Sequence, residues 1–366
     1  MPTPPTVVPP PPATEALASV HTSTFTTLLE RLGISVLVST YQAGKLIVLR
    51  ADGGRVNTHF RDFPVPMGLA WDGRRLAIGG KNRVYELHDV PAVAPKLEPA
   101  GKHDACLLPR TCHFTGDIDV HELAWGAEGL WIVNTRFSCL ATLSHDFSFV
   151  PRWRPPFVSA LSPEDRCHLN GLAIVNGQPH FATALGMTDA NEAWRKDKAR
   201  GGCLLEVATG QAIARGLSMP HSPRWHGGRL FLLESGEGAL SVVEPATGAV
   251  RPIAKLPGFT RGLDFAGQFA FVGLSQVRET AMFSGIPITE RAAERTCGVW
   301  VVDVTNGQVV AFLRFDSGVQ EVFAVQILPR IQYPEVFNET DERYLGSSYV
   351  LPEEALAQVA FKDSQK

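Results

Sequence analysis

The sequence predicts an all-β fold, a six-bladed β-propeller, on three observations. A short apolar phrase with a variable first residue recurs at intervals of about 40 to 60 residues, the range of propeller blades. A glycine-containing turn and a second apolar run follow the first four copies. The two ends of the chain each carry part of one further blade. The copies are Met67-Gly-Leu-Ala-Trp-Asp, His121-Glu-Leu-Ala-Trp-Gly, Asn170-Gly-Leu-Ala-Ile-Val, His221-Ser-Pro-Arg-Trp-His, Arg261-Gly-Leu-Asp-Phe-Ala and Glu321-Val-Phe-Ala-Val-Gln.

The N-terminal part of the chain precedes the first complete copy. Residues 1–20 are rich in proline and predict a flexible tail, and residues 19–32 predict a short helix. Three β-rich runs then predict strands at residues 34–39, 45–49 and 56–60.

Each copy of the phrase opens the innermost strand of one blade, and each unit predicts a meander of about four strands. The last copy, at Glu321, supplies a single strand. That strand and the three N-terminal strands together complete one blade, which joins the chain ends and protects their edges. Residues 21–350 thus predict a single propeller domain, and residues 351–366 a C-terminal tail or a short helix.

Polar side chains gather where the inner strands begin. In a propeller these starts lie on the same face as the ends of the second strands, so the side chains converge on the central channel. The first residue of each phrase is called the phrase head. In an extended chain, the side chain two positions before a phrase head points to the same side as the head itself. The candidate catalytic residues are His121, His168, Asn170, His221 and Glu321. The candidate substrate-binding residues are Asn134, Arg136, Ser222, Glu234 and Arg261.

Two chemistries fit these residues. His121, His221 and Glu321 offer two imidazoles and a carboxylate, a ligand set for catalytic Zn, Fe or Mn. Without a metal, either histidine could serve as a general base, while Arg136 or Arg261 holds an anionic group. Arg261 and Glu321 could also simply pair and fasten neighbouring blades.

Several function classes are excluded or disfavoured. The net charge of −3 and the absence of a Lys/Arg block argue against nucleic-acid binding. No apolar stretch has the length of a membrane span, and no signal sequence is evident, which predicts a cytoplasmic protein. Two polar segments, residues 188–202 and 280–296, interrupt their blades and are candidates to cover the channel mouth.

Several longer phrases resemble a bacterial conserved hypothetical family of unknown function, over nearly the whole chain after residue 20. They are Ser39-Thr-Tyr-Gln-Ala-Gly-Lys-Leu, Asn134-Thr-Arg-Phe-Ser-Cys-Leu-Ala-Thr-Leu, Trp153-Arg-Pro-Pro-Phe, Asp165-Arg-Cys-His-Leu-Asn-Gly-Leu-Ala and Leu217-Ser-Met-Pro-His-Ser-Pro-Arg-Trp.

A weaker likeness is to the six-bladed gluconolactonase and strictosidine synthase propellers. The lactonases hold a divalent metal with a Glu and Asn/Asp residues at strand starts, a style that Glu321 and Asn170 match. His121 and His221 depart from it, which favours a softer metal than Ca²⁺.

The sequence leaves three functions open. The first is an enzyme acting on a small polar or anionic metabolite in the channel, in the style of a hydrolase or lyase. The second is a propeller that binds or senses a small molecule without turnover. The third is a protein-interaction scaffold, whose protein partner the sequence does not identify.

Overall fold

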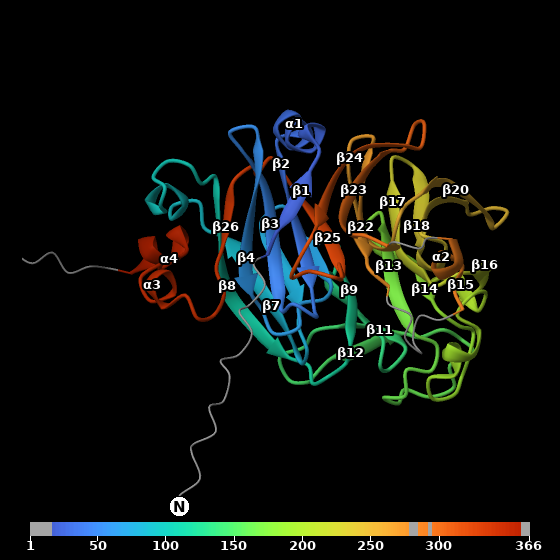
Figure 1. Cartoon of the computed structure of the whole chain (residues 1–366). Helices are drawn as coiled ribbons and strands as arrows, with labels where there is room; N and C mark the ends of the chain where they lie inside the picture. Colours follow the sequence, from blue (N-terminus) through green and yellow to red (C-terminus); the bar gives the residue numbers. More distant parts are fainter. Residues whose placement is uncertain (1–16, 278–284, 292–294, 360–366) are drawn as a thin grey trace, which may run out of the picture.

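The computed structural model describes residues 17–277, 285–291 and 295–359. It confirms the all-β prediction, with six sheets arranged as the blades of a propeller (Figure 1). Most of the predicted flexible tail, residues 1–16, lies outside the described residues, as do the last seven positions of the predicted C-terminal segment, residues 360–366.

Each blade contains four antiparallel strands, named in order from the innermost outward. Blade 1 contains β25 (Ala324–Pro329), β2 (Ile34–Thr40), β3 (Lys45–Asp52) and β4 (Arg55–Asp62). Blade 2 contains β5 (Leu69–Trp71), β6 (Arg75–Gly79), β7 (Arg83–Asp89) and β8 (Ala105–Phe114). Blade 3 contains β9 (Val120–Gly126), β10 (Gly129–Asn134), β11 (Cys139–Thr142) and β12 (Val150–Trp153). Blade 4 contains β13 (Leu169–Val175), β14 (Gln178–Ala184), β15 (Gly202–Glu206) and β16 (Ala212–Leu217). Blade 5 contains β17 (Pro220–His226), β18 (Arg229–Glu234), β19 (Ala239–Glu244) and β20 (Ala249–Lys255). Blade 6 contains β21 (Phe259–Ala266), β22 (Phe269–Ser275), β23 (Cys297–Asp303) and β24 (Gln308–Phe315).

The innermost strands close into a ring. Contacts run from β5 to β9, β13, β17, β21 and β25, and from β25 back to β5. The closing blade is the predicted one: β2 pairs with β25 in the register Ile34↔Pro329 to Ser39↔Ala324 and with β3 on its other side. All seven residues of β2 are buried, as expected for a central strand without a solvent-facing side.

The N-terminal helix prediction needs a correction. Helix α1 (Ser23–Leu32) starts four residues later than predicted, because β1 (Ser19–His21) first adds a fifth strand to blade 6 along the edge of β24. The open hydrogen-bonding edge of β24 explains why these residues are extended. Phe25 and Leu29 of α1 are then buried against the apolar cluster between blades 1 and 6.

The segment after the last phrase also adds to an edge. β26 (Pro334–Val336) pairs in parallel with β8, so the C-terminal part of the chain ties blade 1 to blade 2. The remaining helices are short: η1 (Ala94–Lys96), η2 (Ala193–Asp197), η3 (Ser235–Glu237), α2 (Pro287–Arg291), α3 (Glu342–Leu345) and α4 (Glu353–Gln358). The last of these lies in the segment for which a tail or a short helix was predicted.

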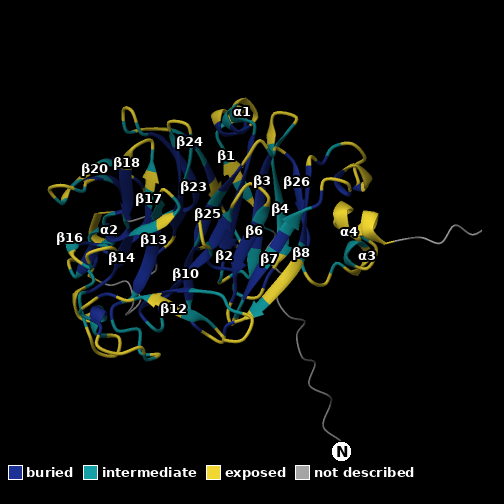
Figure 2. Cartoon of the chain, turned by 180° about the vertical axis from the view of Figure 1, so that it is seen from behind, coloured by how far each residue is buried: buried dark blue, intermediate teal, exposed yellow. Residues whose placement is uncertain are grey.

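The hydrophobic core lies between the blades. Figure 2 shows buried residues concentrated in the strands and exposed residues in the connecting loops. Trp71 and Trp125 pack against the cluster between blades 1, 2 and 3. Trp225, at the same phrase position, is 38% exposed and stacks on Phe181, so this repeat position is not always interior.

Candidate functional site

A cavity of about 610 Å³ opens at the end of the channel where the inner strands begin. Nine of its 22 lining residues come from five pairs of positions, each pair being the first residue of a phrase (the phrase head) and the residue two before it. Four heads line the cavity, namely Met67, His121, His221 and Arg261. All five residues two positions upstream also line it, namely Val65, Asp119, His168, Met219 and Phe259.

The backbone at these upstream positions is unusual. The φ angle is positive at Val65 (54°), Asp119 (54°), His168 (52°) and Met219 (48°), in the left-handed region that residues other than glycine rarely adopt. Such a conformation costs on the order of 1 kcal/mol and is typical of functional sites. Four blades thus repeat the same strained turn at the cavity wall.

Three imidazoles are each anchored through Nδ1. His121 Nδ1 lies 3.3 Å from the carbonyl oxygen and 3.3 Å from carboxylate Oδ1 of Asp119. His168 Nδ1 lies 2.8 Å from Oδ2 of Asp165. Since carbonyl and carboxylate oxygens only accept, each Nδ1 donates its hydrogen to them.

The third histidine follows the same pattern. His221 Nδ1 donates to the carbonyl oxygen of Met219 at 2.9 Å, and the hydroxyl oxygen of Ser235 lies 2.9 Å from the same nitrogen. In all three rings Nδ1 is therefore engaged, and Nε2 is left to face the cavity.

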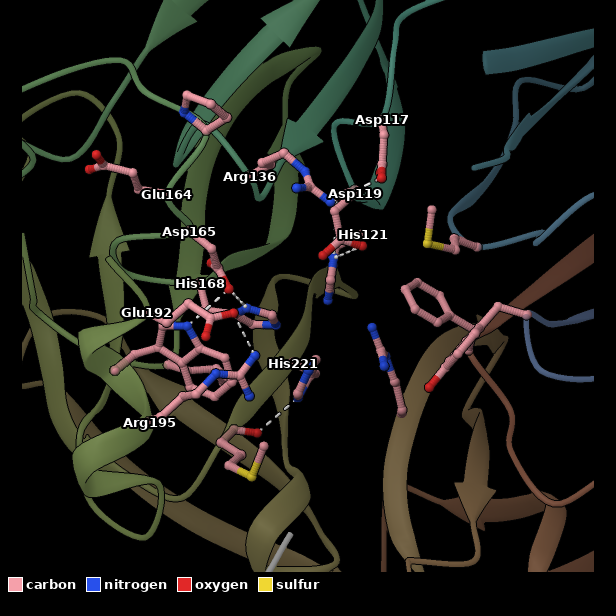
Figure 3. Close-up of a pocket in the computed structure, with 18 of the residues that line it drawn as sticks. Asp117, Asp119, His121, Arg136, Glu164, Asp165, His168, Glu192, Arg195 and His221 are labelled. Carbon is pink, nitrogen blue, oxygen red and sulfur yellow. Dashed lines mark hydrogen bonds and ion pairs between the residues drawn. The ribbon is translucent and has the colours of Figure 1, made fainter. Parts of the chain in front are cut away.

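The three rings surround one space. Figure 3 shows His121, His168 and His221 pointing toward the same part of the cavity. The rings of His121 and His168 meet edge to face with centroids 4.6 Å apart, and His168 packs on Trp194 at 4.3 Å. His121 also meets Phe323 edge to face at 5.3 Å.

The surroundings of two of these rings disfavour their protonated form. Burial, together with Arg261 and the other two histidines, holds the pKa of His221 well below its usual value. Burial also lowers the pKa of His121, although Asp119 acts in the opposite direction. Burial alone raises the pKa of Asp119, but His121 and His168 outweigh it and hold that pKa well below the usual range.

Arg261 is a cation of the cavity wall whose guanidinium group packs against an aromatic ring. Its guanidinium carbon lies 3.5 Å from the ring centroid of Phe323. Its Nη2 is buried and has no hydrogen-bond partner among the described residues. Burial lowers the pKa of Arg261 and Glu321 raises it, but an arginine side chain stays protonated at any ordinary pH.

Two ion pairs lie on the cavity wall near its mouth. Arg136 lies 3.0 Å from Asp117, and Arg195 lies 2.9 Å from Glu192. Both pairs are partly solvent-exposed. They shape the entrance. The Nε atoms of Arg136 and Arg195, like Nη2 of Arg261, are buried without a hydrogen-bond partner, but of these three arginines only Arg261 has no ion pair among the described residues.

Glu321 does not line the cavity. Its Oε2 accepts hydrogen bonds from Thr40 Oγ1 (3.1 Å) and the Gln42 amide (3.3 Å), so it joins two segments of blade 1. Burial raises its pKa to about 7, against the influence of Arg261. Its other oxygen, Oε1, is buried without a hydrogen-bond partner in the described part of the chain. Glu321 is thus not among the cavity-lining residues, which include His121 and His221, the two histidines with which it was expected to share a metal. Among the described residues, no three His, Cys, Asp or Glu side chains are gathered ready to bind one ion.

Asn170, Asn134 and Ser222 also lie off the cavity wall. Asn170 Nδ2 donates to the Pro220 carbonyl at 3.0 Å, which links blades 4 and 5. Asn134 Oδ1 accepts from the Phe137 amide, and Ser222 Oγ accepts from the Gly262 amide. These contacts are structural links at the starts and ends of strands.

Glu234 faces a separate, smaller hollow of about 280 Å³ on the rim. Its Oε2 accepts from Ser241 Oγ, and burial raises its pKa. The structure therefore brings together five of the ten predicted site residues: His121, His168, His221, Arg136 and Arg261.

An ion pair lies deeper in the channel. Arg224 on β17 makes a bidentate contact with Glu122 on β9, with distances of 2.8 Å and 3.1 Å. Blade 4 separates these strands in the ring, so their side chains meet on the axis side. The pair bridges the channel on the inner strands beyond the histidines.

Sequence reasoning missed part of the wall. Trp194, Arg195 and Glu192 come from the insertion at residues 188–202, which was expected to cover the mouth and does contribute to the wall. Trp194 Nε1 donates to Asp165 Oδ2 at 2.9 Å, so the insertion also holds the carboxylate behind His168. Asp165 lies three residues before His168, and this spacing is the sequence feature from which the carboxylate could have been predicted.

The fold defines the class of protein, a six-bladed β-propeller, and a cavity lined by both polar and apolar side chains opens beside the starts of its inner strands. The chain belongs to the family described as a domain of unknown function, DUF4915, whose model matches residues 23–337. A search of curated proteins finds no match. Within the described residues, no helix has the length and apolar character needed to cross a bilayer.

Three solved structures are similar to this chain at low sequence identity, and the two with TM-scores above 0.5 share its fold. A chain in a nidogen/laminin complex is 11% identical, with a TM-score of 0.52, covering 81% of this chain and 99% of that one. A protein of unknown function from Bacteroides caccae is 8% identical, with a TM-score of 0.51, covering 80% and 98%. A virginiamycin B lyase from Staphylococcus aureus is 10% identical, with a TM-score of 0.41, covering 77% and 76%. At these identities the likeness concerns the fold alone.

Proposed function

We propose that the pocket binds a small anionic metabolite through Arg261 and that the surrounding imidazoles act on it, as in a hydrolase or a lyase. One observation carries the proposal: the buried Nη2 of Arg261 lacks a partner among the described residues, in the same cavity as three imidazoles anchored through Nδ1.

The anionic class follows from Arg261. A buried donor without an acceptor carries a desolvation cost that a ligand oxygen removes. Guanidinium groups bind carboxylates and phosphates through parallel hydrogen bonds. The aromatic face of Phe323 beneath the guanidinium fixes its plane, so the anion is expected to approach from the cavity side.

The catalytic class follows from the imidazoles. Each ring is oriented by its Nδ1 hydrogen bond, so each Nε2 presents a lone pair to the cavity. Groups held in this way are suited to accepting a proton or binding a metal next to a bound substrate. The cavity volume of about 610 Å³ lies in the range of small-molecule sites.

Binding of small anions tests the first half of the proposal. The probes are acetate, succinate, citrate and inorganic phosphate, each followed by melting temperature and calorimetry. We expect at least one to stabilise the wild-type protein and to bind about 10- to 100-fold more weakly to Arg261→Met, the loss of one charged hydrogen bond. Arg251→Met, on the exposed outer strand β20, is the matched control and should bind like wild type. Equal binding by Arg261→Met contradicts the proposal.

Turnover separates the enzyme from its main alternative. A bound anion, with its esters or lactones, is incubated with the protein and followed by NMR. Product that forms with wild type and not with His168→Ala supports an enzyme. Binding that depends on Arg261 without any product supports the small-molecule-binding propeller instead. No feature of the described residues favours the protein-interaction scaffold.

A further inference from the structure

We propose that Nε2 of His121, His168 and His221 together bind one divalent transition-metal ion of the Zn²⁺ class. This inference deepens the proposed function and rests on the same pocket. It replaces the carboxylate of Glu321, which faces Thr40 and Gln42, by the imidazole of His168.

The first step is the tautomer of each ring. An imidazole that donates through Nδ1 carries its lone pair on Nε2, and this is the form in which Nε2 binds a metal. Acceptors on Asp119, Asp165 and Met219 fix that form in His121, His168 and His221, respectively.

The second step is the character of the acceptors. Two of them are carboxylates, and metal-ligating histidines commonly donate their second ring nitrogen to a carboxylate or to a backbone carbonyl. Asp165 is itself held by Trp194, whose indole nitrogen donates to the same oxygen at 2.9 Å. The chain therefore carries both the inner ligands and the outer groups that orient them.

The third step is convergence. The histidines come from three consecutive blades, at or just before β9, β13 and β17. The rings of His121 and His168 are already in contact, and His221 lines the same cavity. Figure 3 shows the three rings around one opening.

The rings are not gathered into a preformed site among the described residues. Three lone pairs that face one space repel one another when no cation lies between them. The edge-to-face contact of His121 and His168 is an arrangement that aromatic rings prefer on their own. Binding then requires small combined changes in χ1 and χ2 that bring the Nε2 atoms together and keep each Nδ1 within hydrogen-bond distance of its acceptor.

The ligand set selects the metal. Three nitrogen ligands suit Zn²⁺, Co²⁺ or Ni²⁺ better than Mg²⁺ or Ca²⁺, which prefer oxygen. Neither Cys112 nor Cys167 lines the cavity, so thiolate does not enter the set. A metal with three protein ligands keeps an open position and supplies Lewis-acid chemistry when bound. Arg261 lies on the same wall, where it would hold the anionic part of the substrate.

Metal titration of the full-length protein is the test. After treatment with a chelator, the protein is titrated with Zn²⁺ by calorimetry and with Co²⁺ by visible absorption. We expect one site per chain and a Co²⁺ spectrum typical of nitrogen ligation at low coordination number. His121→Ala, His168→Ala and His221→Ala should each weaken binding at least about 100-fold. His145→Ala, an exposed histidine outside the pocket, should bind like wild type.

Asp165→Asn is a second variant that keeps the three ligands. It should weaken metal binding about 10- to 100-fold, because His168 is then no longer oriented by a carboxylate. It keeps the inference testable if a histidine variant fails to fold. Far-ultraviolet circular dichroism and melting curves check the fold of each variant. Absence of a Zn²⁺ or Co²⁺ site, or a site that survives all three histidine replacements, overturns the inference.

The inference and the proposed function can fail separately. Anion binding that depends on Arg261, with no histidine-dependent metal site, leaves the function standing and removes the metal. The opposite result is a histidine-dependent metal site in a protein that binds none of the anions, whether Zn²⁺ is present or absent. It leaves the metal site standing and removes the proposed function.

Discussion

At the residue scale, the second position of the phrase shows how closely the inner strands approach. Gly171 follows Asn170 on β13. A Cβ atom built on it would lie 2.4 Å from Pro223 Cδ and 2.4 Å from Thr183 Oγ1. Such distances are far inside van der Waals contact, so a side chain at this position must displace the next blade. The glycine is required by packing rather than by its backbone conformation.

Gly171→Ala is therefore expected to destabilise the fold by about 1–3 kcal/mol, the usual cost of overpacking a rigid interior. Urea unfolding measures the effect. Gly68→Ala is the comparison, because its Cβ would approach the Glu122 backbone no closer than 3.1 Å, and its cost should be smaller. A Gly171→Ala protein as stable as wild type would contradict the close approach of blades 4 and 5.

At the element scale, the pair Glu122–Arg224 joins β9 and β17 across the channel. Glu122 is buried, and burial raises its pKa while Arg224 lowers it. Removing one member leaves the other charge without a partner in a poorly hydrated place. Arg224→Met or Glu122→Leu alone should each destabilise the protein by about 3 kcal/mol.

The double variant Glu122→Leu/Arg224→Met should lose clearly less stability than the two single variants together, because neither charge is then left unpaired. Chemical unfolding of the four proteins completes the cycle. The exposed pair Arg152–Glu128, at 2.7 Å, is the control and should show a coupling below about 1 kcal/mol. If the stability losses of the two single variants simply add, the two charges do not depend on each other, which would contradict the prediction.

Much at this scale could be predicted from the sequence. The recurring phrase predicted the positions of the innermost strands. The three N-terminal strands and the single C-terminal strand together predicted the shared blade in which β2 pairs with β25. The edge strands β1 and β26 could not be predicted, because three-residue strands carry no periodicity of their own. They form because β24 and β8 offer free hydrogen-bonding edges.

The candidate site was predictable only in part, for a physical reason. Phrase heads indicated His121, His221 and Arg261, and the two-residue spacing indicated His168. The direction of each side chain depends on local φ angles and on neighbouring blades, which one sequence does not reveal. Glu321 thus bonds within its own blade instead of facing the cavity.

At the scale of the whole molecule, the last strand, β26, fastens blade 1 to blade 2 at the outer edge of the propeller. Glu335 of β26 lies between blades 1 and 2 and is surrounded by basic side chains from blade 1 and from the loop before β8. Its carboxylate oxygens lie 3.8 Å from Arg50, 2.8 Å from His59, 2.7 Å from Arg61 and 3.4 Å from His103. The carboxylate is buried, so this cluster fastens the end of the propeller from inside.

The charge of Glu335 should therefore make global stability depend on pH. Burial alone raises its pKa, but His59 and Arg61 outweigh that effect and lower it to about 2. Because the folded pKa lies below that of the unfolded chain, its stabilisation is complete above about pH 4.5 and is lost as the pH falls toward 2. At pH 7, Glu335→Gln should cost on the order of 3 kcal/mol, and the difference from wild type should shrink between about pH 4.5 and pH 2. Urea unfolding across this range measures it, with Glu354→Gln on the exposed α4 as the control. A difference that stays constant with pH would show that the side chain acts through packing and not through its charge.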